Sequence, residues 1–158
     1  MNILVLCTGN SARSILLEAI FNTAGMGRVR AYSAGSQPAG KVHPQSLTLL
    51  DEMGYDTSNA RSKSWDEFEG PDAPHMDIVI TVCGSAAAET CPIWPGAPIR
   101  AHWEVEDPAT APEALWDNAF STAYDVLNRR ATALLKLPIE RMDAEELKAA
   151  LDRIGKLA

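Results

Sequence analysis

Short apolar runs alternate along the chain with segments of helical periodicity. Apolar runs too short for helices predict buried strands over residues 2–6 and 77–82, and two further strands are expected over 29–34 and 99–102. Apolar side chains at every third or fourth position predict helices over about residues 14–25, 44–54, 112–136 and 143–157. This alternation predicts an α/β fold, a three-layer, four-stranded parallel open sheet flanked by helices, with an extra C-terminal helix after Pro138.

Local signals set the expected helix ends. Ser14 is expected to cap the first helix, and Gly25 with Gly27 to end it. Asp143 and Glu146 have the spacing of a capping box at the start of the last helix. The long helix is expected to turn one apolar face inward, made of Leu115, Ala119, Ala123, Leu127, Ala131 and Leu134.

The composition fits one domain with an ordinary core. The chain has 158 residues, of which 46% are hydrophobic, and its formal net charge is -7. The acidic balance argues against a nucleic-acid or membrane-surface binder, and no apolar run is long enough to predict a transmembrane helix. Three cysteines and the lack of a basic leader before the first strand lead us to expect a cytoplasmic protein with free thiols.

The first strand runs directly into Cys7-Thr8-Gly9-Asn10-Ser11-Ala12-Arg13-Ser14, a Cys-x5-Arg spacing. The N–H groups of this loop can converge on a tetrahedral oxyanion, and Arg13 can add a bidentate donor. The helix N-terminus and the guanidinium are expected to lower the Cys7 pKa, which would make Cys7 a thiolate nucleophile near neutral pH. The alternative is a small core cysteine and a surface arginine, but the strand, glycine and helix around the motif favour the oxyanion site.

A second strand-end cysteine, Cys83, follows the run at 77–82. Ligands of open α/β sheets bind at the carboxyl ends of strands, so Cys7 and Cys83 are expected at one edge of the sheet. Cys91 lies further on, and a Cys83–Cys91 disulfide would require the segment between them to loop back, so this segment can differ in shape between its reduced and oxidised forms. Two alternatives remain open, inert core cysteines and a zinc site completed by His75 or His102.

Asp107-Pro108 follows the expected fourth strand and places a carboxyl group in a rigid, extended turn. If this loop folds over the bound anion, Asp107 can protonate a departing oxygen, and a neighbouring anion would raise its pKa to suit that role. A solvated acidic loop is the alternative. Glu104 and Glu106 are expected to be surface charges.

Together these residues resemble the thioredoxin-coupled arsenate reductases, which are built on the low-molecular-weight protein tyrosine phosphatase fold. The resemblance covers about residues 1–137. It rests on Cys7 to Ser14, Tyr32-Ser33-Ala34-Gly35, Val42-His43-Pro44, Thr81-Val82-Cys83-Gly84, Cys91-Pro92-Ile93-Trp94-Pro95, and His102-Trp103 through Asp107-Pro108-Ala109. It implies a phosphatase-like arsenate reductase domain over 1–137, with 138–158 as a C-terminal helical extension of the same domain.

The resemblance also implies roles for the first site residues. Cys7 attacks arsenate, which Arg13 and the backbone from Thr8 to Ala12 hold, and for which phosphate or sulfate can stand in. Ser14 stabilises the thiolate, and Asp107 protonates the departing oxygen.

The two later cysteines complete a relay in that family. Cys83 attacks Cys7 and arsenite leaves, and Cys91 then attacks Cys83 to give a disulfide that thioredoxin reduces. The resemblance implies no bound cofactor and no metal, and we expect a monomer. Glutathione with glutaredoxin is the alternative reductant.

Two other functions are open at this stage. A phosphomonoesterase could use Cys7, Arg13 and Asp107, with the later cysteines as redox protection, because phosphate and arsenate share shape and charge. A non-catalytic anion-binding or redox-sensing module is the third possibility, which the intact set of three side chains disfavours.

The chain departs from its relatives at a cation site. Some members bind potassium with residues that match Asn10, Glu18 and Ser33 together with an acidic side chain, and Lys63 stands in that acidic position. We expect its ammonium group to replace the ion, so that the protein does not depend on potassium.

Overall fold

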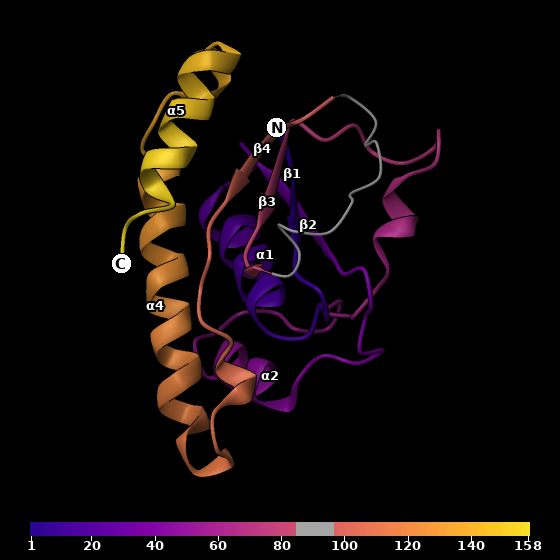
Figure 1. Cartoon of the computed structure of the whole chain (residues 1–158), viewed down its shortest axis with the longest axis vertical. Helices are drawn as coiled ribbons and strands as arrows, with labels where there is room; N and C mark the ends of the chain where they lie inside the picture. Colours follow the sequence, from indigo (N-terminus) through magenta and orange to yellow (C-terminus); the bar gives the residue numbers. More distant parts are fainter. Residues whose placement is uncertain (85–96) are drawn as a thin grey trace.

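The computed structural model describes residues 1–84 and 97–158 and contains a four-stranded parallel sheet (Figure 1). The strands are β1 (Asn2–Leu6), β2 (Arg30–Ala34), β3 (Ile78–Thr81) and β4 (Ile99–His102). Their order is β2-β1-β3-β4, and every neighbouring pair is parallel. The predicted strands are confirmed, with ends that shift by one residue at most.

The sheet separates two apolar clusters because side chains alternate along each strand. Ile3 and Val5 of β1 join the large core, whereas Leu4 and Leu6 point into a smaller cluster on the opposite face. Helices α1 (Arg13–Ala24), α2 (Pro44–Glu52), α4 (Trp116–Leu135) and α5 (Ala144–Ile154) contribute to the large core. The smaller cluster is closed by Phe68 of the 3-10 helix η1 (Trp65–Phe68) and by Met76. This gives the predicted three-layer α/β fold.

Two helix starts differ from the sequence prediction. Helix α1 begins at Arg13, so Ala12 is its N-cap and Ser14, which was expected to cap it, lies inside the helix. Ala12 has no capping side chain, so the N-cap residue leaves the first N–H groups of α1 available to an anion. Helix α4 begins at Trp116 after the 3-10 turn η3 (Glu113–Leu115), and this tighter turn leaves Leu115 exposed rather than on the buried face.

The last helix packs on β4, one of the two edge strands of the described sheet, and on α4 (Figure 1). The expected capping box is present, since Asp143 and Glu146 exchange backbone-to-side-chain hydrogen bonds. Trp103 follows β4 directly, is fully buried, and donates its indole N–H to Leu151 O of α5 at 2.9 Å. None of the helices in the described ranges is long and apolar enough to cross a membrane.

The parallel order brings the chain segments that follow the four strands to one edge of the sheet. Residues 7–13 follow β1, Gly35 follows β2, Cys83 follows β3, and residues 103–109 follow β4. Gly35 is packed so closely on the first loop that a Cβ there would lie 2.3 Å from Thr8 O and 2.7 Å from Cys7 O. A residue without a side chain is therefore required at this position.

We predict that Gly35→Ala destabilises the protein by about 1–3 kcal/mol, because the backbone atoms it would meet cannot move aside cheaply. Gly70→Ala is the matched control, since a Cβ there meets nothing within 4 Å. Urea unfolding measures both, and equal stability of the two variants would contradict the close packing.

Candidate active site

The loop from Cys7 to Arg13 is held in shape from its outer side. Three of its carbonyls accept backbone hydrogen bonds from the segment after β2. The bonds run from Gln37 N to Thr8 O (3.0 Å), from Ala39 N to Gly9 O (2.9 Å) and from His43 N to Ser11 O (3.0 Å). A planar trans peptide directs its N–H opposite to its C=O, so outward carbonyls turn the N–H groups of Gly9, Asn10 and Ala12 inward.

Two hydroxyl groups reinforce the same carbonyls. The hydroxyl of Ser46, a fully buried residue, donates to Ser11 O at 2.9 Å, and that of Ser62 donates to Gly9 O at 3.2 Å. Neither serine was among the site residues predicted from the sequence. The sequence signal for Ser46 is a polar residue on the side of the short helix α2 that faces the core.

Asn10 gives the loop its turn. Its φ of 46° lies in the left-handed region, which asparagine tolerates better than most residues. Its buried side chain donates to Ser14 Oγ at 2.8 Å and accepts from Lys63 N at 2.9 Å. Ser14, also fully buried, is therefore fixed against the loop even though it is not the helix cap.

Arg13 reaches from α1 to the loop that carries Asp107. Its Nη1 donates to Val105 O at 2.9 Å, and its Nη2 lies 3.4 Å from Asp107 Oδ2. Its Nε is buried and has no hydrogen-bond partner in the part of the chain that the structure describes. A buried guanidinium N–H without a partner is costly, which indicates that a ligand oxygen completes the site.

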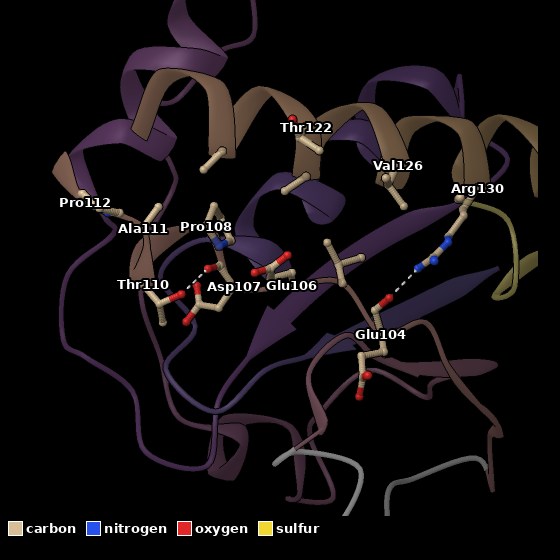
Figure 2. A pocket seen from close by; sticks show the side chains of 14 residues that line it. Glu104, Glu106, Asp107, Pro108, Thr110, Ala111, Pro112, Thr122, Val126 and Arg130 are labelled. Atoms are coloured by element: carbon tan, nitrogen blue, oxygen red, sulfur yellow. Dashed lines mark hydrogen bonds between the residues drawn. The ribbon is translucent and has the colours of Figure 1, made fainter. Parts of the chain in front are cut away.

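Asp107 lies where the sequence predicts it, in an extended conformation before Pro108. Its Oδ1 accepts from Ala109 N at 3.0 Å, and its side chain is about one-third exposed. Its loop borders a cavity of about 610 Å³ that continues along α4 towards Arg130 (Figure 2). Glu104 is exposed, as expected.

Cys83 lies against the anion loop. Thr8 N donates to Cys83 Sγ at 3.4 Å, Thr8 Oγ1 lies 3.6 Å from the same sulfur, and the side chains of Cys7 and Cys83 share a hydrogen bond. Both residues are buried and neither forms a disulfide here. The structure thus brings the two strand-end cysteines together. Cys91 lies outside the described residues.

The expected lowering of the Cys7 pKa is wrong for this arrangement. The hydrogen bond with Cys83 is the largest cause that raises the pKa of Cys7 above its ordinary value, and burial is the second. The charge of Arg13 and the N–H of Gly9 act in the opposite direction without prevailing. Two thiols that share a hydrogen bond do not both ionise, so the sequence argument failed by treating Cys7 alone.

Lys63 lies among the residues of the expected cation site. Its side chain is 7% exposed, and its Nζ lies 3.7 Å from Glu18 Oε2 and donates to Ser33 Oγ at 3.3 Å. Burial lowers the pKa of Lys63 and raises that of Glu18, while each charge partly offsets the effect on the other. In residues 1–84 and 97–158, no group of three or more His, Cys, Asp or Glu side chains could hold a metal ion. The zinc alternative also needs Cys91.

Residues 2–150 match the family model of the low molecular weight phosphotyrosine protein phosphatases. The chain belongs to this family. Proteins named arsenate reductases are also similar to this chain. The arsenate reductase of Bacillus subtilis is 37% identical over 106 residues, which are 67% of this chain and 73% of that protein.

Two further proteins that are similar to this chain have names that state a reductant. A glutaredoxin arsenate reductase of Synechocystis is 32% identical over 67% of this chain and 77% of its own length. The structure of a thioredoxin-dependent arsenate reductase of Corynebacterium glutamicum is similar with a TM-score of 0.62 and 27% identity, over 85% of this chain and 60% of that one. Proteins similar to this chain are therefore named for two different reductants.

We predict that replacing Cys83 lowers the pKa of Cys7, because the largest cause that raises it is removed while Arg13 and the Gly9 N–H remain. The pH dependence of Cys7 alkylation, measured in a Cys91→Ser background, should shift to lower pH in Cys83→Ala. Cys83→Ser keeps a hydrogen-bonding group and should shift less. An unchanged profile in Cys83→Ala would contradict the shared hydrogen bond.

We predict that the thermal unfolding midpoint is the same in potassium and sodium chloride, because the Lys63 ammonium already lies beside Glu18 and Ser33. Lys63→Asp should make the midpoint rise with potassium, since an ion that binds only the folded state stabilises it. A wild-type protein stabilised by potassium over sodium would refute the replacement.

Proposed function

We propose that the protein reduces arsenate to arsenite through a thiol relay. The observation that carries this proposal is the position of Cys83 Sγ against the anion loop, where it interacts with both Thr8 and Cys7. A phosphomonoesterase needs one nucleophile, whereas reduction of arsenic by thiols needs a second sulfur close to the first. The relatives named arsenate reductases support the same reaction.

The substrate binds as an oxyanion in the loop. The inward N–H groups of Gly9, Asn10 and Ala12 and the buried Nε of Arg13 are the donors that would hold its oxygens, with the backbone of Thr8 and Ser11 completing the ring. Thr8 N now donates to Cys83. An entering anion would take over this N–H, displace Cys83 from Cys7, and remove the largest cause of the raised Cys7 pKa.

The first chemical step is attack of the Cys7 thiolate on As(V). An As–S bond forms, an As–O bond breaks, and the departing oxygen takes a proton from Asp107 and leaves as water. Arg13 contacts both the loop that carries the acid and the carboxyl group itself, so one side chain aligns acid and anion. Ser14, bonded to Asn10 behind the loop, would stabilise the thiolate.

The second step transfers two electrons to arsenic. The Cys83 thiolate attacks Cys7 Sγ, an S–S bond forms, the As–S bond breaks, and its electron pair remains on arsenic, which leaves as arsenite. The Cys91 thiolate then attacks Cys83 Sγ, which frees Cys7 and gives a Cys83–Cys91 disulfide. One disulfide formed accounts for the two electrons that As(V) gains.

Electrons return from a dithiol protein partner rather than from a bound cofactor. We assign this role to thioredoxin, with glutathione and glutaredoxin as the alternative that the Synechocystis relative raises. The other assignments from the sequence are part of the same proposal, namely one domain over 1–137 extended by 138–158, a monomer, and a cytoplasmic location without nucleic-acid or membrane partners.

We predict sustained arsenate-dependent NADPH oxidation by the wild type with thioredoxin and thioredoxin reductase. Cys91→Ser should complete at most one turnover, because Cys7 and Cys83 stay joined as a disulfide. If both proteins turn over only with glutathione and glutaredoxin, the relay is wrong although the oxyanion chemistry stands. Aryl phosphate hydrolysis that exceeds arsenate reduction, and that survives loss of Cys83 and Cys91, would instead favour the phosphatase.

A further inference from the structure

Arg130 is a charged residue on the buried face of α4. It is 6% exposed and lies between Leu127 and Ala131, two fully buried residues. Burial, and secondarily the charge of Arg129, lower the pKa of its guanidinium group, so its position there is costly. The buried face predicted for this helix from its apolar residues did not include Arg130.

The guanidinium group joins two segments that are distant in the sequence. Its Nε donates to Leu157 O at 2.9 Å. Its Nη1 donates to Glu104 O at 3.1 Å, a bond that Figure 2 shows. Leu157 follows α5, while Glu104 begins the stretch that leads to Asp107. Arg130 therefore ties the C-terminal segment to the loop that carries the acid.

Two successive carbonyls of this loop are each held by an arginine. Glu104 O accepts from Arg130 of α4, and Val105 O accepts from Arg13 of α1. Asp107 follows two residues later. On its far side, Ala109 N donates to Asp107 Oδ1, and Thr110 N and Oγ1 donate to Asp107 O (Figure 2). The two arginines hold the side of the loop that precedes the acid. The position of the acid thus depends on both anchors.

The space next to the loop would permit it to move. The cavity of about 610 Å³ is lined by the loop from Glu104 to Pro112, by α4 and by Ala158 (Figure 2). No residue in the described ranges fills it. A loop beside an open cavity keeps one position only where specific bonds hold it.

We propose that Arg130 is a positioning residue for Asp107, and that through Arg130 the C-terminal segment sets the geometry of proton donation to the departing oxygen. Arg130 directs its two hydrogen bonds to Glu104 O and Leu157 O rather than to the anion loop, so in this role it acts only through the acid. The inference rests on the role of Asp107 in the proposed function.

A double-mutant cycle with Arg130→Gln and Asp107→Asn tests the proposal. Single-turnover arsenate reduction should slow roughly tenfold to a hundredfold in Arg130→Gln, as expected for a misplaced catalytic group. The same substitution should cause no further loss in Asp107→Asn, because the group it positions is already absent. The phosphate affinity of Arg130→Gln, measured by calorimetry, should equal that of the wild type.

Arg129→Gln is the matched control. The guanidinium group of Arg129 donates to Ala158 O, and its loss leaves both hydrogen bonds of Arg130 in place. It should keep the wild-type rate. If Arg130→Gln does not fold, Arg130→Lys takes its place, since an ammonium can bind one of the two carbonyls, and an intermediate rate is expected.

Additive losses in the cycle, a fall in phosphate affinity, or an Asp107→Asn variant as fast as the wild type would overturn the proposal. A wild type that reduces no arsenate would contradict the proposed function alone. In that case the same double-mutant cycle is measured on phenyl phosphate hydrolysis, in which Asp107 would also protonate a leaving oxygen. The same outcomes then support or overturn the positioning role of Arg130.

Discussion

The outward carbonyls of the anion loop are the constraint on which the site depends. A buried carbonyl without a partner costs about 1–3 kcal/mol, and three such groups in one short loop would oppose its shape. The segment from Gln37 to Ser46 satisfies all three, so the N–H groups on the other side of each peptide are left to face the anion. The binding site is thus a consequence of how β2 and α2 pack on the end of β1.

The contact between Cys7 and Cys83 separates a reductase from a hydrolase on the same loop. A phosphatase gains from an isolated thiolate, whereas here the second thiol raises the pKa of the first. The raised pKa disfavours the Cys7 thiolate while the site is free of substrate. In the proposed relay the gain comes after the first step, because the Cys83 sulfur that the anion displaced has only a short way to return to the arsenic-bearing sulfur of Cys7.

The sequence was sufficient for elements whose cause is local. The sequence located the four strands to within one residue, the capping box located the start of α5, and parallel strand ends placed Cys7 and Cys83 at one edge. It failed where the cause is a tertiary contact. Ser14 was predicted to be the helix cap, whereas the helix begins one residue earlier and its N-cap is Ala12. The pKa of Cys7 depends on Cys83, which is distant in the chain. Ser46 and Arg130 were missed because their partners are backbone carbonyls, which carry no signature.

The central claim is that Cys83 resolves the intermediate on Cys7, and it is tested most directly by mapping disulfides after a single turnover. Reduced Cys91→Ser is mixed with excess arsenate without any reductant, the arsenite is quantified, and the protein is digested for mass spectrometry. The account predicts one arsenite per chain and a Cys7–Cys83 disulfide in the same proportion. Arsenite without that disulfide, or no arsenite at all, would contradict it.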